Sequence, residues 1–220
     1  DFTGDVIQIL EDFSSDCGKP SIHFFGHTHG YSRGQSRDHK HLWINVASAG
    51  GAIDYWGEWP QFDYDEFTVS QDHYGFVVVN VEGGDDPSFT VKRISHGTED
   101  NPLDNVLTDS LRVKMIPNPV ATPVPTFPIN VEVSPECVVL LAEEFSPEVQ
   151  AQLHGQTHWQ VFTDCDLNEE PQFEYWNNFE NQYFNEDTQA NDNLADQEVS
   201  GLNENSSYCW RVRSSPCFDL

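Results

Sequence analysis

The sequence contains little positive charge. Of its 220 residues, only 10 are Lys or Arg against 37 that are Asp or Glu, which gives a formal net charge of −27 at pH 7. A surface this acidic repels DNA, RNA and anionic lipid within a Debye length. The composition therefore excludes a nucleic-acid partner and polybasic attachment to a membrane.

Long hydrophobic runs are also missing. No segment approaches the roughly 20 consecutive apolar residues that a membrane-spanning helix needs, so we expect no membrane span. Residues 1–10 do not have the basic and then apolar layout of a signal peptide. Low lysine content and acid-rich loops nevertheless favour an extracellular or cell-surface location.

Aromatic residues, in contrast, are plentiful. They make up 13% of the chain, with six Trp, and hydrophobic residues make up 37%. This content indicates a folded chain in spite of its charge, and the length predicts one or two domains. Composition divides the sequence into a first domain at 1–97, a Pro-rich linker at 98–128 and a second domain at 129–220.

The first region is expected to contain one helix followed by strands. Apolar residues recur at helical spacing between Val6 and Phe13, and Gly18 and Pro20 end the pattern. The helix, a buried strand and an antiparallel hairpin across 82–87 together predict a mixed sheet. The predicted strands are 21–25, 42–47, 75–81 and 88–94.

The segment best suited to chemistry follows the first predicted strand and reads Gly26-His27-Thr28-His29-Gly30. Side chains two apart in an extended chain share a face, so His27 and His29 are predicted to point toward one site. Neutral imidazole nitrogen suits zinc, iron and manganese. For an isolated His-x-His in a loop, an ordinary exposed turn is the favoured interpretation.

The longer string favours the metal interpretation. Gly26-His27-Thr28-His29 after an apolar strand resembles the last metal-binding motif of the calcineurin-like metallophosphoesterases. Its continuation through Tyr31 and Arg33 resembles the purple acid phosphatase branch, and residues 46–51 and 74–79 are similar to the end of that domain. The resemblance implies that the first region is the C-terminal part of an α/β sandwich with a mixed sheet.

The resemblance also implies a function. His27 and His29 each bind one of two adjacent metal ions, which are divalent or of the Fe, Zn or Mn type. Between such ions a metal-bound hydroxide hydrolyses a phosphate ester. Tyr31 and Arg33 are placed near the phosphate by the same resemblance, and the guanidinium group matches phosphate in a bidentate manner.

The other motifs of that family, D-x-H, G-D-x-x-D, G-N-H and a further His, precede Gly-His-x-His in the chain, and none is present here. We therefore expect a C-terminal portion that is inactive alone and whose partner is the remainder of its own metallophosphoesterase domain. An alternative from a different class is a non-catalytic extracellular surface or adhesion protein built on a phosphatase-like scaffold.

The third region alternates polar and apolar residues in short segments separated by turn signals, which predicts a β-sandwich with strands at 131–133, 138–142, 158–162 and 208–212. Residues 201–213 resemble the corner and sixth strand of a fibronectin type III domain. The resemblance implies that the Tyr208 hydroxyl ties back to the turn and that Trp159 lies in the core. Since seven residues follow Arg213, the sandwich is expected to be incomplete at its C-terminus or to borrow a strand.

The five cysteines leave disulfide pairing open. Four of them fall in the third region, where three pairings are open and Cys209 is expected to pair with Cys165 or Cys217. Cys17 would be left over. Reduced cysteines that pack as small hydrophobic side chains are the alternative. The cysteines are Cys17, Cys137, Cys165, Cys209 and Cys217.

Overall fold

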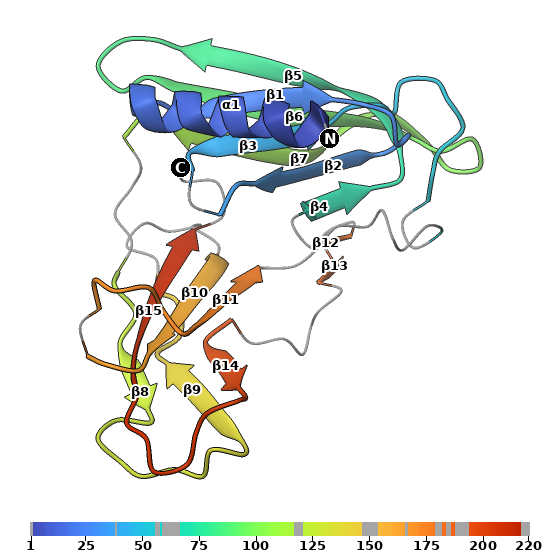
Figure 1. The fold of residues 1–220 in the computed structure, drawn as a ribbon. Coiled ribbons are helices and arrows are strands. Elements are labelled where there is room, and N and C mark those ends of the chain that lie inside the picture. The colour runs from blue at the N-terminus through green and yellow to red at the C-terminus, as the bar shows by residue number, and fades with distance from the viewer. Residues whose placement is uncertain are drawn as a thin grey trace. The chain divides into compact units, whose positions relative to one another are not determined.

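The computed structural model describes residues 2–37, 39–55, 58, 67–116, 121–146, 154–165, 167–178, 182–183, 186–187 and 194–216 (Figure 1). Among the described residues, strands account for 49% and helix for 8%. The chain divides into two compact units. The first comes from 1–118 and 180–190, and the second from 119–179 and 191–217.

The expected α/β sandwich is wrong, because the described residues contain one helix, α1 (Phe2–Cys17), among several small sheets. An α/β sandwich needs crossover helices between parallel strands. Helical spacing of apolar residues ends near Cys17, and the described elements that follow are all strands. The all-β expectation for the third region is compatible with the structure.

The first sheet of the first unit is mixed and runs in the order β1-β3-β2-β4-β12-β13. β1 and β3 are parallel, with Phe25 opposite Asn45. β2 lies between β3 and β4 and is antiparallel to both. The strands are β1 (Ser21–Phe25), β2 (Tyr31–Gln35), β3 (His41–Asn45), β4 (Phe67–Gln71), β12 (Gln182–Tyr183) and β13 (Glu186–Asp187).

The second sheet of this unit is an antiparallel meander of β5 (Tyr74–Glu82), β6 (Ser88–Gly97) and β7 (Pro102–Lys114). The hairpin predicted across 82–87 is confirmed by the pairing of β5 with β6. The predicted linker at 98–128 differs from the structure, since it contains β7. Leu111 and Val113 of β7 are buried, and their alternation with polar residues suits a strand with one covered face.

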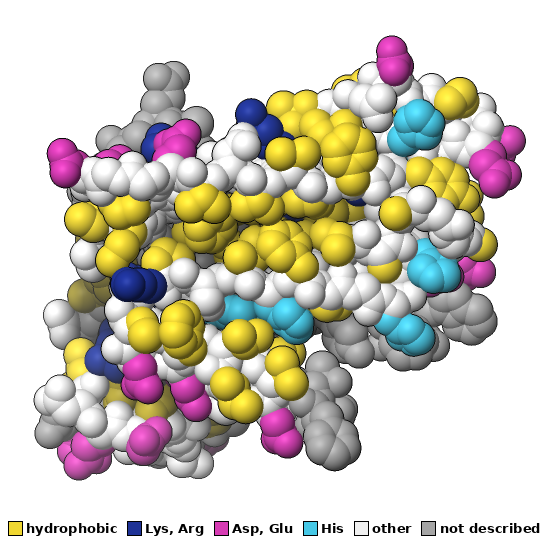
Figure 2. All heavy atoms as spheres, turned by 90° about the horizontal axis from the view of Figure 1, so that it is seen from above, with side chains coloured by type: hydrophobic (Ala, Val, Ile, Leu, Met, Phe, Trp, Pro, Cys, Tyr) yellow, Lys and Arg dark blue, Asp and Glu magenta, His cyan; other side chains and the backbone are white. Residues whose placement is uncertain are grey.

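β5 carries hydrophobic side chains that the rest of the described chain does not cover. Phe76, Val78 and Val79 are exposed, and Val81 is 81% exposed. Figure 2 looks from above onto this side of the first unit and shows hydrophobic side chains gathered in a band. Contiguous apolar surface of this kind marks a place where another structure packs.

Helix α1 contacts β1 and β3. Ser14 is buried and its hydroxyl is hydrogen bonded to Ser21 and to the Lys40 carbonyl. The apolar side chains of Ile9 and Phe13 are 65% and 51% exposed. Ile7 and Leu10, on the same side of the helix as Ser14, are partly buried, so the helix carries apolar side chains both toward the sheet and outward.

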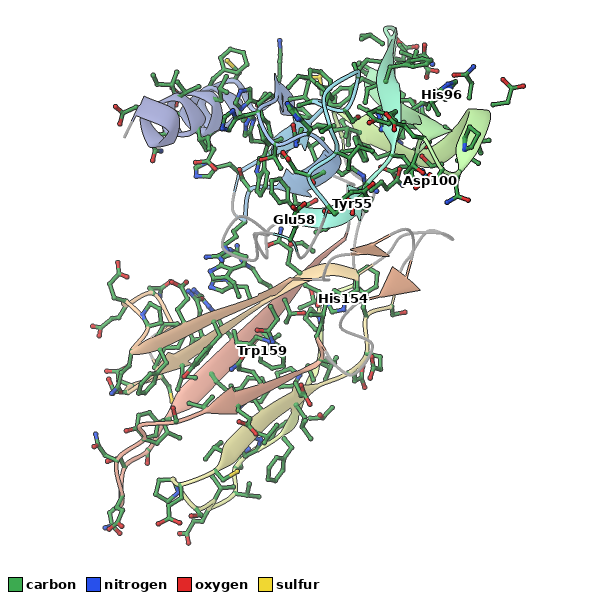
Figure 3. All side chains as sticks on the ribbon, turned by 90° about the vertical axis from the view of Figure 1, so that its right-hand side faces the viewer. Tyr55, Glu58, His96, Asp100, His154 and Trp159 are labelled. Carbon is green, nitrogen blue, oxygen red and sulfur yellow. A yellow bond between two sulfur atoms is a disulfide. The ribbon has the colours of Figure 1, made fainter. Side chains whose placement is uncertain are left out.

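The second unit consists of two three-stranded sheets, β14-β9-β8 and β11-β10-β15. Trp159 is fully buried among Val138, Leu140, Val161 and Val212, which confirms its predicted place in the core (Figure 3). The strands are β8 (Pro125–Phe127), β9 (Val138–Ala142), β10 (His154–Phe162), β11 (Phe173–Asn178), β14 (Asp196–Val199) and β15 (Cys209–Pro216).

The tie between Tyr208 and the preceding turn is also confirmed. The Asn203 amide donates a hydrogen bond to the Tyr208 hydroxyl at 2.9 Å.

A disulfide joins Cys165 to Cys209, while Cys17 and Cys137 are exposed free thiols and Cys217 lies outside the described residues. The strand predicted at 131–133 is absent, and these residues are exposed in an irregular segment.

Candidate metal centre

The His-x-His segment leaves the carboxyl end of β1, beside the carboxyl end of its parallel neighbour β3. The Val46 amide donates to the Phe25 carbonyl at 2.9 Å, so the two chains stay together as they leave the sheet. A Cβ on Gly26 would lie 3.0 Å from the Ala47 Cβ. Glycine at this position therefore lets the two segments approach closely.

His27 adopts a backbone conformation that L-residues rarely take. Its φ is 142°, and its side chain is exposed. A non-glycine residue at such a φ costs about 1–3 kcal/mol and persists where the surroundings enforce it, often at functional sites. The strain lies on one of the two predicted metal ligands.

His29 is held in a defined orientation. Its Nδ1 lies 2.8 Å from the Ala52 carbonyl oxygen. Because a carbonyl oxygen only accepts hydrogen bonds, Nδ1 carries the proton and Nε2 keeps its lone pair. Metal-binding histidines commonly donate their other ring N–H to a backbone carbonyl in this way.

The backbone around His29 is fixed by Asp54 and Asn45. The His29 amide donates to Asp54 Oδ2 at 2.8 Å, and the Asp54 amide donates to the His29 carbonyl at 3.0 Å. Asn45, buried at the end of β3, donates through Nδ2 to the Thr28 carbonyl at 2.8 Å. Three hydrogen bonds thus hold the segment on which both histidines lie.

The two imidazoles fit a metal of the zinc, iron or manganese type as nitrogen ligands. Protein metal sites of this type use three or four protein ligands. Within the described ranges, no group of three or more His, Cys, Asp or Glu side chains is placed to hold a metal ion.

Tyr31 and Arg33, the predicted phosphate contacts, are buried on β2 and engage Asp109 of β7. The Tyr31 hydroxyl donates to Asp109 Oδ2 at 2.7 Å, and Arg33 Nη2 donates to Asp109 Oδ1 at 2.8 Å. The fully buried Arg93 lies with its guanidinium 5.0 Å from the centre of the Tyr31 ring. The geometry assigns Tyr31 and Arg33 to a polar link between the two sheets of the first unit.

Burial and charge perturb the pKa values of Tyr31, Arg93 and Asp109. Burial raises the pKa of Tyr31 well above its ordinary value, and the Asp109 carboxylate raises it further. Burial lowers the pKa of Arg93 to about 10. For Asp109, burial acts to raise the pKa, but the Arg33 charge and the hydrogen bonds from Arg33 and Tyr31 outweigh it and lower the pKa.

Sequence reasoning missed Asn45, Asp54 and Asp109. Asp54 belongs to an aromatic stretch, 54–60, of which only 54, 55 and 58 are described. Asn45 ends a predicted strand, and a polar residue at that position was the available signal. Asp109 has no local signal, because its partners lie more than 70 residues earlier.

Comparison of the chain with models of protein families, with curated proteins and with solved structures finds no match. Among the helical residues that the structure describes, no helix has the length and apolar content to cross a membrane.

Proposed function

We propose that His27 and His29 are ligands of a two-metal hydrolytic centre that acts on phosphate esters, as in the metallophosphoesterases of the purple acid phosphatase type. The proposal rests on the resemblance of the Gly26–Arg33 string and on the local geometry of the two histidines. A strained His27 and an oriented His29 follow the carboxyl end of β1, beside the end of its parallel neighbour β3.

The observation that carries the proposal is the hydrogen bond from His29 Nδ1 to the Ala52 carbonyl. An exposed histidine-rich turn has no need for a fixed tautomer. A metal ligand does, because the ring must present a lone pair rather than a proton. His29 meets that requirement through Nε2.

His27 and His29 would each hold one ion, and the loop at 51–54 would keep the His29 ring in place. When bound, the ions supply Lewis acidity and a hydroxide at neutral pH. The remaining ligands come from the remainder of the same metallophosphoesterase domain. The uncovered hydrophobic side chains of β5 support this part of the proposal, because they offer a surface for such a structure to pack on.

An extracellular or cell-surface location is part of the proposal. The Cys165–Cys209 disulfide supports it, because disulfides persist in oxidising compartments.

Metal binding tests the proposal directly. Equilibrium dialysis against Zn²⁺ or Mn²⁺ is expected to show binding by the 220-residue chain, and its loss in the His27→Ala, His29→Ala double variant. His96→Ala removes an exposed imidazole from β6 and serves as the matched control (Figure 3). Because a single histidine holds an ion weakly, the dialysis covers micromolar to millimolar metal.

Two outcomes would count against the proposal. Equal binding by the double variant and the wild type would remove His27 and His29 from the site. Absence of binding by the wild type over the whole range would favour the non-catalytic surface or adhesion protein instead.

A further inference from the structure

We infer that Asp54 is a positioning residue for His29, one that fixes which ring nitrogen is free to bind a metal. The inference rests on the proposed function, since it concerns the same site. It goes beyond it by assigning a role to a residue that no metal motif contains.

Asp54 contacts His29 through two hydrogen bonds of opposite direction. Its Oδ2 accepts from the His29 amide at 2.8 Å, and its own amide donates to the His29 carbonyl at 3.0 Å. One residue thus fixes both the amide and the carbonyl group of His29. A hydrogen bond to a carboxylate is about twice as strong as a neutral one, so the side-chain contact is the stronger of the two. We call this pair of hydrogen bonds between Asp54 and the His29 backbone the Asp54 bracket.

The Asp54 bracket sets the position of the Ala52 carbonyl relative to the His29 imidazole. Ala52 precedes Asp54 by two residues, so fixing Asp54 against the His29 backbone fixes the short chain that reaches Nδ1. Gly51 lies against the ring itself, since a Cβ built on Gly51 would come within 2.6–3.0 Å of three His29 ring atoms. Residues 51–54 therefore wrap around one histidine.

The chemical consequence concerns the tautomer of His29. While Ala52 accepts a hydrogen bond, the proton stays on Nδ1 and Nε2 is a ligand. Without that acceptor in place, the ring is free to rotate or to carry its proton on Nε2. A protonated Nε2 has no lone pair to offer a metal ion. Asp54 acts on the metal through His29 rather than by contact.

The other residues that hold the segment do not have this effect. Asn45 binds the Thr28 carbonyl, which lies before His29, and Asp109 binds Tyr31 and Arg33, which lie after it. Asp54 is the described side chain whose hydrogen bond goes to the His29 backbone.

The tautomer is measured by ¹⁵N chemical shifts of the His29 ring, which distinguish a protonated from an unprotonated nitrogen without any metal. We expect the Nδ1–H form in the wild type and in Asp54→Asn, whose amide oxygen still accepts from the His29 amide. Asp54→Ala is expected to lose that form and to bind Zn²⁺ about 10–100-fold more weakly, the usual cost of removing an outer contact.

Glu58→Ala is the matched control. It removes one acidic side chain four residues further along, which accepts from the Tyr55 amide rather than from His29 (Figure 3). We expect this variant to keep the wild-type ¹⁵N shifts of the His29 ring and wild-type Zn²⁺ binding. The comparison separates a general effect of removing negative charge from the effect of the Asp54 bracket. Gly51→Ala gives a second route to the same result. Its new methyl group displaces the ring while Asp54 stays intact.

The outcomes separate this inference from the proposed function. If Asp54→Ala folds and keeps both the Nδ1–H form and wild-type Zn²⁺ affinity, the inference is overturned while the metal site stands. If Asp54→Ala loses the Nδ1–H form but the wild type binds no Zn²⁺, Asp54 orients His29 as inferred and the proposed function fails. Unfolding of Asp54→Ala leaves the decision to Asp54→Leu, which also lacks the carboxylate acceptor and in which unchanged ring shifts and unchanged affinity would overturn the inference.

Discussion

His154, at the start of β10, is an ionisable residue whose protonation opposes folding. Its Nε2 lies 2.7 Å from the Thr157 hydroxyl, and its ring stacks on Phe145 with centroids 4.8 Å apart. Burial lowers its pKa to about 4. A histidine in the unfolded chain titrates near 6.5, so the unfolded state takes up the proton first as the pH falls.

The expected result is a loss of stability between pH 6.5 and about pH 4. The contribution of His154 is full above pH 6.5, where both states are neutral, and declines toward the folded pKa. Urea unfolding of the wild type and His154→Gln at pH 7 and pH 4.5 measures it, and the variant should lose less stability on acidification. A wild-type-minus-variant difference that stays constant between the two pH values contradicts the assignment.

His158 shows the same dependence of a tautomer on its neighbours that His29 does. Arg213 Nε donates to His158 Nδ1 at 2.8 Å, and because arginine can only donate, Nδ1 is the acceptor. The proton therefore lies on Nε2, 2.6 Å from Glu174 Oε1. Burial lowers the pKa of His158, so the neutral form is favoured in the folded sheet.

At the scale of elements, the polar link at Asp109 joins β7 to β2. Its carboxylate is the partner of Arg33, and Arg93 lies in the same buried region. Removing one member of a buried ion pair leaves the other charge without compensation and costs about 3–5 kcal/mol. We expect Asp109→Ala to destabilise the first unit by an amount of this order.

Asp104→Ala is the matched control for this prediction, because Asp104 lies on the same strand and is exposed. Its effect on the free energy of unfolding should stay within about 0.5 kcal/mol. Urea unfolding followed by tryptophan fluorescence measures both variants. Equal midpoints for Asp109→Ala and Asp104→Ala would show that the link contributes nothing to the joining of the two sheets.

The elements show how far sequence patterns lead. β1 and the β5–β6 hairpin were predictable, because apolar runs bounded by Gly and Pro are local signals. β2 was not, since Tyr31-Ser-Arg-Gly-Gln35 reads as polar, and all five residues are buried only because partner strands and Asp109 surround them. β7 was hidden in the same way by its many polar residues.

Local sequence patterns likewise predict some residues of the candidate site and not others. His27 and His29 were predicted from their spacing and from the resemblance of the Gly26–Arg33 string to a known metal motif. Asp54 and Asp109 act through contacts that span 25 and more than 70 residues, and no local pattern encodes contacts of that separation.

At the scale of the whole molecule, the net charge of −27 acts on every state of the chain. Like charges brought together by folding repel one another, and salt screens them. The Debye length falls from about 30 Å at 0.01 M to about 3 Å at 1 M ionic strength. We therefore expect the melting temperature at pH 7 to rise as NaCl is increased across this range.

The control is the same pair of salt concentrations near pH 4.3, the isoelectric point of the sequence, where the net charge vanishes. The rise in melting temperature should be smaller there. KCl in place of NaCl at pH 7 should give the same rise, because screening does not depend on which monovalent ion is used. An equal rise at both pH values would show that repulsion is not the cause.

The contact of Gly51 with the His29 ring has an evolutionary consequence. A methyl group at position 51 would occupy space that the imidazole fills, so the two positions are coupled in any sequence that keeps this loop. Related chains that retain histidine at 29 should retain glycine at 51. Chains that have lost the histidine should be free to vary at both positions, and the two losses should occur together.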